Sequence, residues 1–343
     1  MIEIDNKAIE KDQVLSSLNF MKISDVIFAA TLSYSDLKKF NIKNFRIIEN
    51  NNNLITFVNC TFELKENDII FCQSDYLELL FQILKNEKFE NLKLISSQSD
   101  RKINRNIFNK KPSCIKHWYS TNVTFKSTNL KSIPLGIAPY RNTKSVIFDD
   151  FNDIDVKNNK NISIYSNFNV NTNYFHRVRA YKQVIKSQLC NLQNFKSYED
   201  YLENLKQNFY SIAPWGNGID THRIWESIYL GVVPITKDHL HYRNLNHFPI
   251  LLLKSYKHLS KIKDFKTFEN INYNALKINW WREIINEHKV VNYTESKLFT
   301  IEKKEVAYLE NLLKTKSFKN KFFKKILTLL RKLDSKINIF HKI

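Results

Sequence analysis

The chain has 343 residues, of which 43% are hydrophobic and 25% are charged. This length is sufficient for two domains with a core each, and the composition excludes a disordered chain. A net charge of +19 predicts an anionic partner, such as nucleic acid, a membrane surface or a phosphorylated substrate. About nine of these charges lie in residues 314–343, where ten Lys or Arg accompany one acid, Asp334.

The cysteines and the apolar runs exclude further classes of protein. The four cysteines are scattered without the spacing of a zinc site or a disulfide framework, which fits a reducing cytosol. The first residues are too charged for a signal peptide, and no apolar run approaches the roughly 18 residues of a membrane span. We therefore expect a cytoplasmic protein that is soluble or bound peripherally to a membrane.

Residues 1–150 are predicted to form a first α/β domain. An amphipathic helix is expected over 76–88. Continuous apolar runs bounded by polar turns are typical of strands that are covered on both faces in a parallel sheet. Five such runs are expected to be strands: 25–32, 45–49, 54–58, 68–72 and 92–97.

A second alternating series is predicted over residues 161–313. It follows residues 151–160, a polar stretch without apolar periodicity that we interpret as a linker. Strands are expected at 162–168, 209–213, 232–236 and 249–253, and helices near 174–189, 198–206, 220–230, 255–262 and 273–287. Two successive α/β units with a ligand between them are a common architecture of enzymes that use nucleotides.

The glycines concentrate in one stretch, "PWGNGIDTHRIWESIYLG" at 214–231, which holds three of the four in the chain. Its first part is predicted to be a loop between the carboxyl end of a strand and the amino end of a helix, where backbone N–H groups and the helix dipole favour an anion. Asp220 or Thr221 is expected to cap the helix, and Gly231 to end it.

The helix of this stretch has two different faces. Arg223, Glu226 and Ser227 share one of them. An arginine one turn into the helix suits a diphosphate, and a carboxylate one turn further suits two ribose hydroxyls. The alternative is an ordinary i,i+3 salt bridge between Arg223 and Glu226, with glycines that only make a turn. The opposite face, which we expect to contact the core, carries Ile224, Trp225 and Ile228.

The sequence "FYSIAPWGNGIDTHRIWESIYLGVVPITKD" resembles the sugar-nucleotide-binding signature of exostosin-like glycosyltransferases and related bacterial glycan transferases. Supporting matches are "KHWYSTNV", "LKSIPLGI" and "SNFNVNTNYFHRVRAY", so that the resemblance covers about 90–290 and is strongest at 208–238. It implies a GT-B fold, in which two Rossmann-like domains face each other across a cleft, and a hexosyl- or pentosyltransferase activity.

The same resemblance implies roles for individual residues. It assigns Arg223 to the diphosphate and Glu226 to the ribose of the donor, and it favours Arg177 as a further phosphate contact. Many retaining enzymes of this fold carry a second glutamate eight residues before the ribose glutamate; here that position is Gly218, which favours an inverting mechanism. The other expected donor-site residues are Gly216, Asn217, Asp220, His222 and Ser227.

An inverting transfer needs a general base. Asp100, which follows a predicted strand, and His117, which lies in an aromatic stretch, are the candidates; the alternatives are a turn aspartate and a packing histidine. Asp153 and Asp155 match the D-x-D pattern of metal-dependent transferases, but they lie in the predicted linker. We therefore expect no metal and no cofactor other than the nucleotide sugar, which is a substrate.

The tail, residues 314–343, is predicted to form a basic amphipathic helix that binds an anionic membrane surface, which suits a lipid-linked glycan acceptor. The alternative is a packing helix with a solvated basic face. Nucleic acid is not expected as a partner, because no RRM, KH, helix-turn-helix or zinc pattern is present. The sequence thus predicts a glycosyltransferase of lipopolysaccharide or capsule type; the alternatives are a non-catalytic nucleotide- or glycan-binding protein and a nucleic-acid-binding protein.

Overall fold

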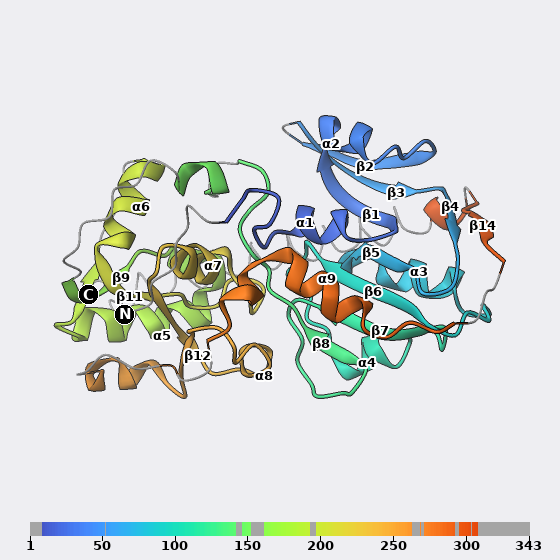
Figure 1. The fold of residues 1–343 in the computed structure, drawn as a ribbon. Coiled ribbons are helices and arrows are strands. Elements are labelled where there is room, and N and C mark those ends of the chain that lie inside the picture. The colour runs from blue at the N-terminus through green and yellow to red at the C-terminus, as the bar shows by residue number, and fades with distance from the viewer. Residues whose placement is uncertain are drawn as a thin grey trace, which may run out of the picture.

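The computed structural model is a mixed α/β structure with two large sheets in two halves and a small two-stranded sheet (Figure 1). The blue and teal half holds a seven-stranded sheet, and the green to orange half holds a five-stranded one. The mixed α/β class predicted from the sequence is therefore confirmed. The structure describes residues 9–51, 53–141, 146–151, 161–192, 197–262, 268, 271–291, 295–302 and 304–307.

The seven-stranded sheet has the order β2-β3-β1-β5-β6-β7-β8. Its strands are β1 (Val26–Ser33), β2 (Phe45–Asn51), β3 (Leu54–Asn59), β5 (Ile69–Gln73), β6 (Leu92–Ser97), β7 (Ile115–Ser120) and β8 (Leu130–Ser132). The five neighbouring strands β1, β5, β6, β7 and β8 are parallel to one another. At the other side of β1, β3 pairs antiparallel with both β1 and β2. The expectation of a wholly parallel sheet is wrong at this edge, because β2 and β3 form a hairpin and β2 is largely exposed.

Helices cover both faces of this sheet because adjacent strand residues point to opposite sides. Ile27 packs in the cluster with α1 (Ser17–Lys22), and Phe28 in the cluster with α3 (Leu77–Ile83). The helix expected at 76–88 is shorter than predicted, since only polar residues follow its C-cap, Leu84. Two shorter helices, α2 (Tyr34–Lys39) and α4 (Arg105–Phe108), follow β1 and β6.

The five-stranded sheet is parallel throughout, with the order β10-β9-β11-β12-β13. The predicted helices at 174–189 and 198–206 are confirmed as α5 (Tyr174–Lys186) and α6 (Tyr198–Lys206). The strands are β9 (Asn161–Ser166), β10 (Cys190–Leu192), β11 (Asn208–Ile212), β12 (Val233–Lys237) and β13 (Leu251–Leu253). The helices are α5 (Tyr174–Lys186), α6 (Tyr198–Lys206), α7 (His222–Tyr229) and α8 (Leu240–Arg243), with 3₁₀ turns η4 (Val170–Asn173) and η5 (Tyr256–Lys261).

The two faces of the second sheet belong to different clusters. Ile164 packs with α5 and η5, whereas the adjacent Tyr165 packs with α6 and α7. The second of these clusters continues without interruption into the first half of the molecule, where it includes the face of the sheet that α1 covers. The two halves therefore share one buried core along their contact.

After β13 the chain returns to the first half. The helix expected at 273–287 is divided into a 3₁₀ turn, η6 (Tyr273–Leu276), and α9 (Ile278–Asn286), because Lys277 between them has extended backbone angles. The ring of Trp281 in α9 meets Phe20 of α1 edge to face. A last strand, β14 (Lys297–Thr300), pairs antiparallel with β4 (Thr61–Leu64) beside the first sheet (Figure 1). This part of the expected second domain, residues 161–313, thus lies against the first sheet.

The predicted linker and the basic tail lie largely outside the described residues. Phe148 and Phe151, in the 3₁₀ turn η3 (Phe148–Phe151) that leads to the predicted linker, are buried. Residues 152–160, with the D-x-D pattern at Asp153 and Asp155, and the basic tail at 314–343 lie outside the described residues. Among the helices that the structure describes, none is long and apolar enough to cross a membrane.

Candidate functional site

The glycine-rich loop connects the carboxyl end of β11 to the amino end of α7, as the sequence predicts. Carboxyl ends of parallel strands are the usual place for ligands in open α/β sheets. Gly216 is buried and Asn217 is exposed, and their backbone N–H groups have no acceptor among the described residues. Two such groups near a helix amino end suit an anion.

The two glycines of the loop have different structural reasons. A Cβ atom on Gly218 would lie 3.1 Å from the side chains of Asn122 and Asp100, so this residue permits a close approach of the two halves. A Cβ atom on Gly216 would meet its nearest neighbours at 3.6 Å, which is ordinary contact. Gly231 follows α7 with a φ of 64° and ends the helix as predicted.

Polar side chains that follow β6 and β7 hold this loop. Asp100 Oδ1 accepts a hydrogen bond from the N–H of Gly218 at 3.0 Å. Asn122 Oδ1 accepts two, from Ile219 N at 2.8 Å and Asp220 N at 2.9 Å. Asn122 itself has a φ of 57°, a left-handed conformation that asparagine tolerates better than most residues. The loop is therefore docked on the first half through its own backbone.

Asp220 is the buried centre of this contact. Its Oδ1 accepts hydrogen bonds from Thr221 N at 2.8 Å and from the Trp225 indole N–H at 3.0 Å. Its Oδ2 accepts a hydrogen bond from Leu135 N at 2.9 Å and lies 3.2 Å from His241 Nε2. Thr221 occupies the N-cap position of α7, but its side chain makes no capping bond. The N-cap position predicted for Thr221 is confirmed, but the expected capping bond from a side chain is not formed among the described residues, because the Asp220 carboxylate instead accepts from Thr221 N, Trp225 and Leu135.

His222 also contacts the first half. Its Nδ1 lies 2.7 Å from the carbonyl oxygen of Gly136. Because a carbonyl can only accept, Nδ1 carries the proton, and in the neutral ring Nε2 is left as an acceptor. Gly136 has a φ of 73°, and a Cβ atom there would lie 2.1 Å from Leu15 O, so only glycine fits at this position.

Arg177, in the first turn of α5, is buried behind the loop with 8% of its surface exposed. Its guanidinium donates to three backbone carbonyls: Nε to Trp215 O at 2.9 Å, Nη1 to Asn169 O at 2.8 Å and Nη2 to Pro214 O at 3.3 Å. Two of its five N–H groups remain for a ligand. Burial and then the nearby Arg223 lower the pKa of Arg177 to about 10. A buried arginine with a second arginine near it favours an anion.

Tyr201 of α6 joins the two residues of α7 that were predicted to hold the donor. Its hydroxyl donates to Glu226 Oε2 at 2.6 Å, and Arg223 Nε lies 3.4 Å from it. Burial by itself lowers the pKa of Arg223. The Tyr201 hydroxyl and the Glu226 carboxylate more than offset this effect, so that the pKa of Arg223 is raised overall. Although both residues are described, Arg223 and Glu226 form no ion pair. The ordinary salt bridge is thus not the arrangement here.

Two predicted site residues are placed away from this cluster. Ser227 is fully buried and shares a hydrogen bond with Ser211, at 2.7 Å between their Oγ atoms, so it faces the sheet. His117 lies near the amino end of β7, whereas Asn122 and the loop lie beyond its carboxyl end. Its ring stacks on His288 at 4.4 Å, and burial together with His288 lowers its pKa to about 4. His117 therefore has the contacts of a packing residue.

Sequence reasoning missed three residues of the site: Asn122, Tyr201 and Trp215. An asparagine directly after a buried strand is a signal that could have found the first. Tyr201 and Trp215 gave no comparable signal, because aromatic residues in apolar segments usually belong to a core. The expected helix faces are confirmed for Ile224, Trp225 and Ile228, which are fully buried.

Searches with the sequence against models of known protein families and against curated proteins find no match.

Proposed function

We propose that the protein is a glycosyltransferase of the GT-B type that transfers a sugar from a nucleotide-sugar donor to a bacterial surface glycan of lipopolysaccharide or capsule type. The observation that carries the proposal is Arg177, which is buried at the carboxyl edge of a parallel sheet and close to Arg223. Within the described part of the chain, its hydrogen bonds go to backbone carbonyls. In this proposal the two arginines and the N–H groups of Gly216 and Asn217 bind the diphosphate.

The remaining roles follow from the contacts of α7. Glu226 accepts hydrogen bonds from the ribose hydroxyls. Tyr201 orients the Glu226 carboxylate through the hydrogen bond at 2.6 Å. His222, whose proton is fixed on Nδ1, presents Nε2 as a proton acceptor near the loop. Asp100 remains a candidate for the general base, although Oδ1 already accepts from Gly218. We propose an inverting, metal-independent transfer at the inner face of the cytoplasmic membrane, bound through the basic tail.

A second candidate is a protein of the same fold that binds a nucleotide or glycan without catalysis. It is favoured by the engagement of the predicted bases: Asp100 is bonded to the loop, and His117 is stacked on His288 away from it. Binding of a nucleotide sugar without hydrolysis or transfer would favour this candidate over the first.

The test is a thermal-shift and hydrolysis screen against UDP-, GDP-, CMP- and dTDP-sugars, followed by calorimetry with the best nucleotide. We expect Glu226→Gln and Arg223→Ala each to weaken binding by roughly 1.5 to 3 kcal/mol, the range for a hydrogen bond to a charged group. Glu203→Gln, an exposed position on α6, is the matched control and should bind normally. Equal affinity of the wild type and both site variants would overturn the assignment.

A further inference from the structure

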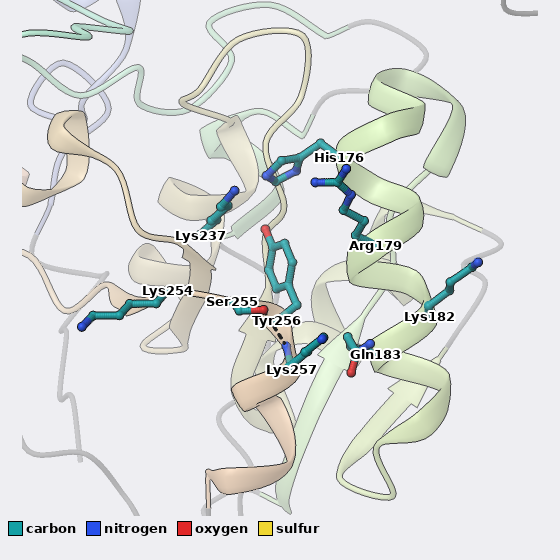
Figure 2. A pocket seen from close by; sticks show the side chains of 9 residues that line it. All are labelled: His176, Arg179, Lys182, Gln183, Lys237, Lys254, Ser255, Tyr256 and Lys257. Atoms are coloured by element: carbon teal, nitrogen blue, oxygen red, sulfur yellow. Dashed lines mark hydrogen bonds between the residues drawn. The ribbon is translucent and has the colours of Figure 1, made fainter.

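A second group of cations lines a pocket of about 240 Å³ between α5, the end of β12 and η5 (Figure 2). Lys237 is the last residue of β12, and Lys254 directly follows β13, so the pocket opens at the carboxyl edge of the second sheet. Its five cations are Arg179, Lys182, Lys237, Lys254 and Lys257.

Among the residues that the structure describes, the lining of this pocket contains no carboxylate. Among the ion pairs of the described ranges, none involves Arg179, Lys237 or Lys254. The nearest carboxylate in sequence, Asp238, is already paired with Arg243. Arg179, Lys237 and Lys254 therefore add positive charge that no ion pair within the described ranges offsets, and an anion in the pocket would reduce their mutual repulsion.

Aromatic rings form one wall of the pocket. The ring of His176 stacks on Trp215 with centroids 4.6 Å apart and an angle of 6° between the planes. Both ring nitrogens of His176 are buried and have no hydrogen-bond partner within the described residues. In Figure 2 the hydroxyl of Tyr256 points toward the same space. Burial is the main cause that lowers the pKa of His176 to about 4, and the nearby cations Lys237, Arg177 and Arg179 lower it further.

Trp215 contacts residues of both this pocket and the proposed donor site. Its carbonyl accepts from Arg177 on one side. Its ring contacts His176 and Lys237 on the other, with Lys237 Nζ 5.6 Å from the ring centroid. We propose that the pocket is a second anion site, which binds a compact phosphate ester or diphosphate independently of Arg177 and Arg223. This inference does not depend on the proposed donor or on transferase activity.

The phosphate group has two possible sources, a free phosphorylated metabolite or a phosphorylated glycan or lipid acceptor. Inorganic pyrophosphate tests the shared chemistry, and hexose 6-phosphate and a short-chain prenyl diphosphate separate the sources. All three are titrated calorimetrically into the full chain at low salt. To weaken binding at the proposed donor site, the same titrations are made in an Arg223→Ala background.

The pocket variant combines Arg179→Gln and Lys254→Gln, because both residues are exposed and their replacement should not disturb the core. Its matched control combines Lys186→Gln and Lys261→Gln, which remove the same charge from exposed positions outside the pocket. We expect pyrophosphate binding to weaken roughly ten- to a hundredfold in the pocket variant only.

Equal losses in both double variants would show a general charge effect and overturn the proposal, as would the absence of pyrophosphate binding in the Arg223→Ala background. Loss of binding in the pocket variant with donor hydrolysis unaffected would support it. A protein that binds pyrophosphate in the pocket but turns over no nucleotide sugar would support the second anion site and count against the transferase, so the two failures are distinguishable.

Discussion

The two sides of the glycine-rich loop differ in how their polar groups are paired. On the side of Gly218, Asp220 and His222, the polar groups meet partners from the first half of the molecule at 2.7 to 3.0 Å. On the side of Arg177 and the cation-lined pocket, donors outnumber acceptors and carboxylates are scarce. The residues around the loop thus divide into a group that joins the two halves and a group with hydrogen-bonding capacity left for a ligand.

The strongest test of the paired side is Asp220→Ala. The substitution leaves the N–H of Leu135 and the indole of Trp225 without their buried acceptor, so we expect the free energy of unfolding to fall by about 3 to 5 kcal/mol. Asp238→Ala removes an aspartate whose partner, Arg243, is largely exposed, and should cost at most about 1 kcal/mol. Urea denaturation measures both; similar losses would erase the distinction between buried junction and surface pair.

The two loop glycines, Gly216 and Gly218, are expected to differ in how strongly an alanine in their place destabilises the fold. Gly218→Ala places a methyl group 3.1 Å from Asn122 and Asp100, and crowding of this kind costs about 1 to 3 kcal/mol. Gly216→Ala adds a methyl group at 3.6 Å and should change the free energy of unfolding by less than about 1 kcal/mol. If Gly216→Ala proved the more destabilising of the two in the same denaturation experiment, the close docking of Gly218 would be wrong.

The smallest expected effect is the pH dependence that His176 contributes. Its pKa is about 4 in the folded chain and about 6.5 when unfolded, so below pH 6.5 the unfolded state binds the proton more readily. Stability should therefore decrease as the pH falls from 6.5 toward 4, by about 1 kcal/mol per pH unit or less. His176→Phe keeps the stacking on Trp215 and should reduce the slope of this part of the profile, to which other histidines with a lowered pKa, such as His117, also contribute. An unchanged profile in the variant would show that the ring is solvated.

The sequence predicted most strands and helices of the second sheet because its apolar runs are short, continuous and bounded by polar turns. It failed where pairing depends on distant partners. The antiparallel β2 and β3 have the same local pattern as parallel strands, and β14 is recognisable only through its partner β4. The short strands β8 and β10 owe their conformation to neighbours rather than to local preference.

The candidate site was predictable in position but not in the roles of all its residues. The glycines, Arg223 and Glu226 are recognisable by spacing along the chain. The carboxylate of Asp220 accepts hydrogen bonds from Leu135 and Trp225. No local sequence pattern encodes the first of these bonds, because Leu135 and Asp220 are 85 positions apart in the chain. Ser227 was expected on the ligand face because helical periodicity cannot tell an exposed polar face from a buried one.

The return of the chain to the first half determines how the protein can be divided. A fragment that ends near residue 150 would contain β4 without β14, leaving Phe62 without the ring of Phe299 that stacks on it at 5.3 Å. It would also lack α9, whose Trp281 covers Phe20. The second fragment would carry these missing pieces as unpaired apolar surface. When expressed separately, the two halves would therefore expose complementary apolar surfaces and associate with each other. A single proteolytic cut between the halves would leave the two fragments bound together.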